Sequence, residues 1–448
     1  MGKKASRNAI AQSAAVTSKP DPQAAASAAL VQSIRKFNAK REPERLALKY
    51  AKMRVDAFAF MRGSCHRFYS QMPQPGVVRN APLAWICGDL HLENFGSYKG
   101  DNRLAYFDIN DFDEAVLAPL SWDVVRLLAS IDVACAVAAS HGKDKARQPG
   151  PARANRLCEQ FLADYAVALH SGKPLWLERD TAVGPVRALL DSLRERGRPE
   201  FLNSRTEIQG KQRRIRIDGS KNLTASAAER ADVMAFMATF ASTQAAPDFF
   251  KVIDVARRVA GTGSLGLVRF SILVRGKGSP DGNYLLDLKE APTPSLLPLL
   301  PTSQPAWASQ AQRVVTLQQR MQAVPMAFLN PVQISLGGRT RPAVLRGLQA
   351  SEDRLAVGLA DLQAGDQSLV IRNMAQLTAW AHLRGAGRSG AADIDALMDY
   401  AQAGQSRPKL LATSQTKLLA VAASCAADVR SDFELYARAY DAGEFALR

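Results

Sequence analysis

Two short apolar runs separated by a polar loop open the most informative part of the chain. Residues 83–87 are apolar and lead into Gly88, which is typical of a buried strand that ends in a loop. A second apolar run covers 103–109, and residues 99–102 before it have the composition of a hairpin turn. Apolar residues then recur at helical spacing over 122–139. This part of the sequence predicts a strand, a loop, a hairpin and a helix, in that order.

The pattern changes near Val252. Apolar and less apolar residues alternate over 268–274 and 284–288, as they do in half-buried strands, and the segment between them has turn composition. A helix is predicted over 309–323, and a further strand over 343–348. These segments form a β-rich region.

Helical patterns flank both of these regions. One or two helices are predicted over 33–60. Residues 151–240 are predicted to be mostly helical, around an Arg-, Gly- and Pro-rich loop at 194–222, and the chain is predicted to be helical again from Asp353. Strands and helices segregate in this way in α+β proteins.

Composition is that of a globular protein, with 47% hydrophobic and 22% charged residues. No run approaches the ~20 apolar residues of a membrane span, and the Ala- and Ser-rich N-terminus lacks the apolar segment of a secretory signal. The five cysteines have no metal-binding spacing. We therefore expect a cytoplasmic protein with no disulfide framework and no contact with a membrane.

The net charge of +16 raises the question whether the protein binds an anionic partner. Residues 1–62 carry 13 Lys and Arg against 4 Asp and Glu, and residues 211–216 form a second basic stretch. We interpret these as a solvated tail and a basic loop, with binding to the phosphates of a nucleotide or an anionic substrate as the alternative. No motif for dedicated nucleic-acid recognition accompanies them.

The two polar loops carry the residue types that phosphoryl transfer requires. Asp89 is the candidate base that accepts or orients the proton of an acceptor hydroxyl. Asn94 and Asp111 are candidate Mg²⁺ ligands, with Asp108 as a rival carboxylate, because Mg²⁺ prefers hard oxygen ligands. His91 either assists phosphate or metal binding or is a structural histidine.

Charged residues beside these loops have their own predicted roles. Asp113 and Glu114 extend the acidic cluster, which is costly between apolar residues unless a cation compensates it. Asp123 is expected to brace the backbone of the first loop. Arg62 is interpreted as an ordinary cation at a helix end.

A glycine-rich segment indicates where a nucleotide could bind. Gly261, Gly263 and Gly266 fit GxGxxG, with Ser264 between them, but a strand follows where a dinucleotide-binding fold needs a helix. Strand, glycine loop, strand, turn and strand is instead typical of the phosphate-covering flap of protein kinases, where backbone N–H groups approach the phosphates. Lys289 lies on the opposite face of the third strand from Leu286 and Leu288 and is predicted to reach the phosphates.

These motifs resemble those of known proteins. The segment 88–91 with Asn94, followed by 111–115, is similar to the catalytic and metal loops of aminoglycoside phosphotransferases and other protein-kinase-like enzymes. A closer resemblance, covering roughly residues 40 to 390, is to the uncharacterised bacterial DUF2252 family. It rests on five segments: 60–63, 87–96, 107–114, 122–123 and 289–291.

The resemblance implies a kinase-like two-lobe α+β fold with a larger, mostly helical lobe. Because the catalytic loop precedes the glycine-rich lobe, the fold is expected to be circularly permuted. The predicted parts are a disordered basic tail (1–30), a catalytic helical region (31–245), a β-rich nucleotide-binding region (246–350) and a helical region that completes the catalytic lobe (351–448). In that last region, 374–383 is expected to pack beneath the loop that carries Asp89.

One departure from kinases concerns the partner of Lys289. Kinases usually pair this lysine with a glutamate on the next helix, but no Asp or Glu occurs between Ala291 and Ser351. Either Glu290, an acid elsewhere or the metal cluster therefore balances Lys289, or the nucleotide binds differently.

The predicted function is ATP- and Mg²⁺-dependent transfer of phosphate to a hydroxyl of an unknown small-molecule or protein acceptor. Two alternatives remain open at this point. One is a non-catalytic nucleotide-binding scaffold on a degenerate kinase-like fold, and the other is an AMP transferase on the same fold.

Overall fold

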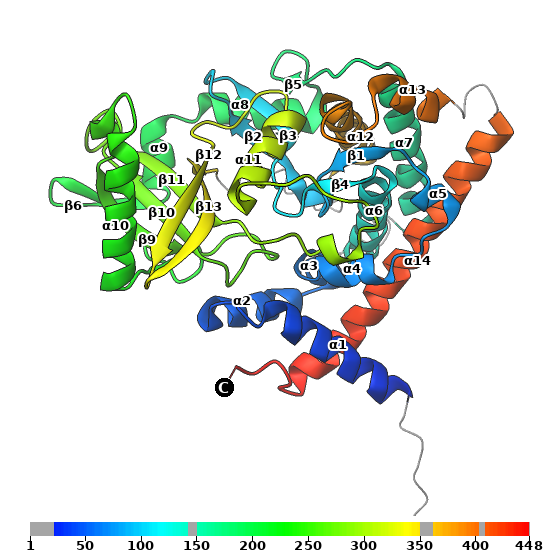
Figure 1. Ribbon diagram of the computed structural model, residues 1–448, viewed down its shortest axis with the longest axis horizontal. Coiled ribbons are helices and arrows are strands. Elements are labelled where there is room, and N and C mark those ends of the chain that lie inside the picture. Colours follow the sequence, from blue (N-terminus) through cyan, green and yellow to red (C-terminus); the bar gives the residue numbers. More distant parts are fainter. Residues whose placement is uncertain (1–21, 142–149, 350–361, 403–407, 448) are drawn as a thin grey trace, which may run out of the picture.

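The computed structural model describes residues 22–141, 150–349, 362–402 and 408–447. A β-rich part and a helical part lie side by side, and the first two helices run along one edge of both (Figure 1). The chain is a mixed α+β protein, as the hydrophobic pattern predicts. None of the described helices combines the length and apolar character needed to cross a bilayer.

Two small sheets carry the polar loops within the helical part. β1 (Leu83–Ile86) pairs antiparallel with β4 (Val116–Pro119). β2 (Phe95–Lys99) and β3 (Ala105–Ile109) form the predicted hairpin, to which β5 (Leu177–Glu178) adds a short edge. The helices of this part are α3 (Ala57–Gly63), α4 (Cys65–Gln71), α5 (Gly76–Arg79), α6 (Ser121–His141), α7 (Pro151–His170), α8 (Gly184–Glu195), α12 (Ala364–Gly385), α13 (Ile394–Gln402) and α14 (Pro408–Asp441).

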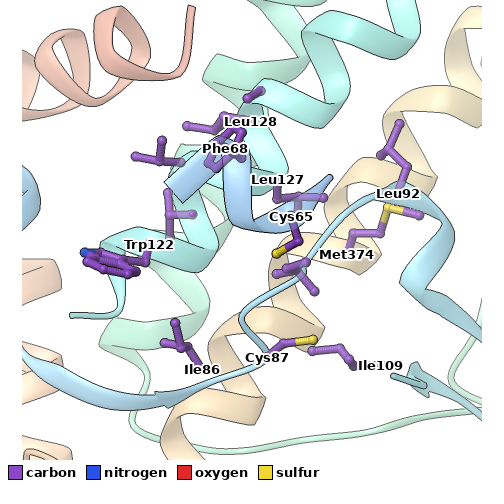
Figure 2. Packing of buried hydrophobic residues seen from close by; sticks show 14 of the residues in the cluster. Cys65, Phe68, Ile86, Cys87, Leu92, Ile109, Trp122, Leu127, Leu128 and Met374 are labelled. Carbon is purple, nitrogen blue, oxygen red and sulfur yellow. The ribbon is translucent and has the colours of Figure 1, made fainter. Parts of the chain in front are cut away.

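The core of the helical part lies beneath the loop that follows β1. Figure 2 shows Cys87 and Ile109 close to Met374 of α12, with Leu127 and Leu128 of α6 nearby, all in one buried cluster. α12 therefore packs beneath the first polar loop, as predicted, although it follows the β-rich part in sequence.

The β-rich part is a six-stranded antiparallel sheet in the order β12-β13-β11-β10-β9-β8. Its strands are β8 (Asn222–Thr224), β9 (Val252–Arg258), β10 (Arg269–Val274), β11 (Tyr284–Glu290), β12 (Asn330–Leu336) and β13 (Arg339–Gly347). The glycine-rich segment connects β9 to β10, and α11 (Gln310–Met321) lies between β11 and β12 along the chain.

The two faces of this sheet have different covers. α10 (Ala227–Ser242) packs on the face that carries Leu286 and Leu288. α9 (Arg198–Asn203) and the hairpin of β6 (Thr206–Gln209) and β7 (Gln212–Ile215) cover part of the other face, through Leu202 and Ile215. Lys289 lies on this second face, at the end of the strand nearest the helical part.

The structure differs from the pattern-based prediction in three respects. The segment 194–222, predicted as a basic loop, contains the β6–β7 hairpin, in which the Arg213 side chain is 1% exposed and donates to Asn203 and Asp281. The strands β4, β5, β8 and β12 were not predicted. The predicted disordered tail overlaps α1 (Pro22–Asn38), which is helical from Pro22; its residues 1–21 lie outside the described part. α2 (Pro43–Met53) follows α1.

Gly88 shows how tightly the first polar loop packs against the second. Its φ is +82°, and a Cβ there would lie 2.3 Å from the carbonyl oxygen of Glu114. A side chain is therefore excluded by both the backbone conformation and the neighbouring loop.

We expect Gly88→Ala to lower the free energy of unfolding by about 2 kcal/mol or more, from the strained φ and the overlap together. Urea unfolding measures this. Gly365→Ala, in the exposed first turn of α12 with no neighbour within 4 Å, is the matched control and should leave stability unchanged or slightly raised. Equal stability of the two variants would mean that the loops do not approach as described.

Candidate functional site

Most of the predicted site residues from the two halves of the chain line one cavity; Asp108, Gly266 and Lys289 do not. Asp89, Asn94 and Asp111 come from the loops of the helical part, and the segment 261–264 comes from the glycine-rich loop. His91, Asp113 and Glu114 also line this cavity, which we call the acidic cavity.

The loop that carries Asp89 is fixed from below by α6. Both carboxylate oxygens of Asp123 accept backbone N–H groups of this loop, from Cys87 at 2.7 Å and from Gly88 at 2.9 Å. Asp123 is 0% exposed, and His382 of α12 lies 3.4 Å from it. The bracing role predicted for Asp123 is confirmed.

Asp89 is held by an arginine that the sequence analysis did not single out. Arg126, one helical turn after Asp123, donates to Asp89 through Nε at 2.9 Å and through Nη2. Its side chain is 0% exposed and also donates to the carbonyl of Met61. Burial raises the pKa of Asp89, and the Arg126 guanidinium opposes that shift.

The amide of Asn94 is oriented by the same loop. Its Nδ2 donates to the carbonyl oxygen of Asp89, so its side-chain oxygen is the atom left to act as a ligand. His91 is 4% exposed, and its Nδ1 accepts the backbone N–H of Glu93 at the start of a 3-10 turn. His91 thus has a structural contact as well as a place in the cavity wall.

The acidic residues of the second loop supply the partner of Lys289. The Lys289 Nζ lies 2.5 Å from Asp113 and 3.3 Å from Asp111, and the lysine side chain is 4% exposed. Glu290 instead pairs with Arg341 at 2.9 Å. Of the alternatives left open by the sequence, the acidic cluster is the partner of Lys289.

Asp108 is the one candidate ligand that lies apart from the others. Its carboxylate accepts the backbone N–H of Ala323 at 3.1 Å, after α11, and lies 3.7 Å from Arg384 of α12. It is 2% exposed and does not line the acidic cavity. These contacts give Asp108 a structural role. Side chains alternate along β3, so Asp108 lies on the opposite face from Phe107 and Ile109, which pack in the main core.

The glycine-rich loop covers the acidic cavity. A Cβ on Gly263 would lie 3.1 Å from the carbonyl oxygen of Arg62 and 4.0 Å from Asp89 Oδ2, so the loop backbone itself approaches Asp89. Ser264 donates to the carbonyl of Ala260. Gly266 lies outside the cavity, against the Arg41 side chain.

Two cations, one from the segment between α1 and α2 and one from α2, hold this loop in place. Arg41 donates to the carbonyls of Gly263 at 2.7 Å and Leu265 at 2.6 Å, and Lys49 donates to Gly263 at 3.3 Å. Lys49 is fully buried, and burial together with the neighbouring Arg41 lowers its pKa well below the usual range. Arg62, interpreted from sequence as an ordinary helix-end cation, lines the cavity and pairs with Glu93 at 2.6 Å.

A dedicated all-protein metal cage is absent from the described part of the chain, where no group of three or more His, Cys, Asp and Glu side chains is placed to hold an ion. Asn94 and Asp111 offer one amide oxygen and one carboxylate. That donor set suits Mg²⁺, which takes one or two protein carboxylates and completes its octahedron with phosphates and water.

Glu114 titrates near neutral pH in this setting. Burial raises its pKa to about 7, the nearby Asp89 adds to the shift, and the backbone N–H and hydroxyl of Ser295 oppose it by donating to its carboxylate at 2.6 and 2.9 Å. Because the folded state then binds the proton more tightly than the unfolded state, stability falls as pH rises from about 4.5 to about 7.

We therefore expect the wild-type protein, in metal-free buffer, to lose about 2 to 3 kcal/mol more stability between pH 5 and pH 8 than Glu114→Gln loses. Urea unfolding at the two pH values measures the difference. A variant with the same pH dependence as the wild type would show that Glu114 is not the group responsible.

Comparison with known proteins yields a family and no function. The sequence profile of DUF2252, described as an uncharacterised protein conserved in bacteria, matches residues 41–439. No curated protein and no solved structure matches the chain. Since the matched segment covers most of the 448 residues, the chain belongs to the DUF2252 family.

Proposed function

We propose that this protein is an ATP- and Mg²⁺-dependent phosphotransferase that transfers phosphate to a hydroxyl group of its acceptor. One observation carries the proposal: the glycine-rich loop and the loops bearing Asp89, Asn94 and Asp111 line the same cavity, although about 150 residues separate them in sequence. Phosphoryl transfer needs this combination, since the phosphates must lie between backbone amides on one side and metal ligands on the other.

The arrangement of the elements supports a kinase-like fold in permuted order. β9, the glycine-rich loop, β10, β11 and α11 follow one another as in a nucleotide-binding lobe, and Lys289 extends from β11 to the acidic cluster. α12, which follows this lobe, packs beneath the loop after β1. In this proposal the helices after the sheet complete the catalytic lobe.

Asp89 is the proposed base, and Arg126 its positioning residue. The buried guanidinium fixes the Asp89 carboxylate and favours its ionised form. One of its oxygens can then accept the acceptor's proton as the acceptor oxygen bonds to the γ-phosphorus and the bond to the β–γ bridging oxygen breaks, releasing ADP. Lys289 and the loop amides neutralise charge on the phosphates. Asn94 and Asp111 would hold Mg²⁺, which neutralises phosphate charge when bound.

We predict that Asp89→Asn lowers the rate of ATP turnover by about 10²- to 10⁴-fold, because the amide still accepts from Arg126 but cannot take a proton. The rate is measured with Mg-ATP and a fractionated metabolite or protein pool as the source of acceptor. Asp248→Asn, which changes an exposed carboxylate of the sheet part, is the control and should keep the wild-type rate.

Calorimetric measurement of ATP binding distinguishes a wrong assignment of Asp89 as the base from a protein that binds nucleotide without catalysis. Wild-type rates in an Asp89→Asn protein that still binds ATP would remove Asp89 as the base. Binding of Mg-ATP by the wild type with no turnover of any pool would instead favour a non-catalytic nucleotide-binding protein.

A further inference from the structure

Three arginines surround one buried aspartate on the sheet face that carries Lys289. Arg258 of β9 lies 3.0 Å from Asp287 of β11, Arg269 of β10 lies 2.7 Å from it, and Arg346 of β13 lies 3.4 Å from it. The side chain of Asp287 is 1% exposed, and those of the arginines are 7 to 12% exposed. We call this group the arginine cluster.

The arginine cluster holds more positive charge than its aspartate can balance. Within the described residues, Asp287 is the only carboxylate in a salt bridge with any of the three arginines. Burial lowers the pKa of Arg258 to about 9; Asp287 opposes this shift, and Arg269 and Arg346 add to it. Asp111 and Asp113 also act on Arg269, but both pair with Lys289, so positive charge remains in surplus. Burying that surplus is unfavourable unless an anion joins it.

A cavity of about 230 Å³ lies directly against this cluster. Arg258, Arg269 and Arg346 line it, and Lys52, Arg205 and Lys221 add further positive charge to its wall. Among the residues that the structure describes, no Asp or Glu lines it. Such a wall suits an anion with several oxygen atoms, because arginine donates paired N–H groups to phosphate.

This cavity meets the acidic cavity at the glycine-rich loop. Gly261 lines both. Asp287 and Lys289 lie two residues apart on the same face of β11, a distance of roughly 6 to 7 Å. A chain of two or three linked phosphates can span that length.

We propose that the arginine cluster binds phosphate groups, in the form of a diphosphate or longer chain. These phosphates belong either to the nucleotide or to a phosphorylated acceptor, and this choice of ligand rests on the proposed function, in which the glycine-rich loop carries phosphates.

Calorimetric titration with inorganic pyrophosphate, without nucleotide or metal and at constant ionic strength, tests the cluster itself. Arg346→Gln should weaken binding at least tenfold, and Arg346→Lys should weaken it less. Arg275→Gln removes the same charge from an exposed arginine directly after β10 and should change the affinity less than twofold. Asp287→Asn removes the negative charge of the cluster. Provided that its circular dichroism spectrum shows a folded protein, this variant should bind pyrophosphate more tightly than the wild type.

The proposal is overturned if wild type does not bind pyrophosphate, or if Arg346→Gln and Arg275→Gln bind it equally. ATP titration identifies the source of the phosphates. Loss of ATP affinity in Arg346→Gln, with competition between ATP and pyrophosphate, supports the nucleotide's own phosphates. Unchanged ATP affinity with simultaneous binding supports a phosphorylated acceptor. Pyrophosphate binding without any ATP binding supports the cluster and contradicts the proposed function.

Discussion

The ion pair between Lys289 and the acidic loop joins the sheet to the helical part at the site. Lys289 is 4% exposed and Asp113 is 19% exposed, so both charges are largely removed from water. Removing one partner of such a pair costs about 3–5 kcal/mol, because the other charge is left buried and unpaired. Arg313 of α11 fixes the same loop by donating to the carbonyls of Asp113 and Ala115. The place of the glycine-rich loop above Asp89 depends on these contacts.

Local patterns were enough to predict the elements around the site. The apolar runs at 83–87 and 103–109 contain β1 and β3, as predicted. The alternating segments around Phe270 and Leu286 form β10 and β11. Asp123 was predicted as a brace because a carboxylate at the start of an apolar helix needs buried donors, and its two amide contacts supply them. These predictions succeeded because the spacing of apolar residues and the need of a buried carboxylate for hydrogen-bond donors can both be recognised in a short stretch of sequence.

Contacts between distant segments could not be read in the same way. Arg126 is the one Arg or Lys within the mostly apolar helix α6, and that was the only signal that it faces a buried carboxylate. Nothing near Arg41 indicates that it holds a loop more than 200 residues away. Asp108 and Asp111 are both aspartates three residues apart, and the sequence does not show that Asp111 faces the acidic cavity while Asp108, in β3, does not. The β6–β7 hairpin was hidden because Arg213 occupies a buried position where apolar residues are expected.

The central claim is that the glycine-rich loop supplies the phosphate-binding backbone amides of one cavity, and that the loops of the helical part supply its metal ligands. A crystal structure of the protein with Mg²⁺ and a non-hydrolysable ATP analogue tests it most directly. The account predicts phosphates between Gly263 and the pair Asn94 and Asp111, with Mg²⁺ on the latter two residues. A nucleotide bound elsewhere, or bound there with no contact to both loops, would contradict it.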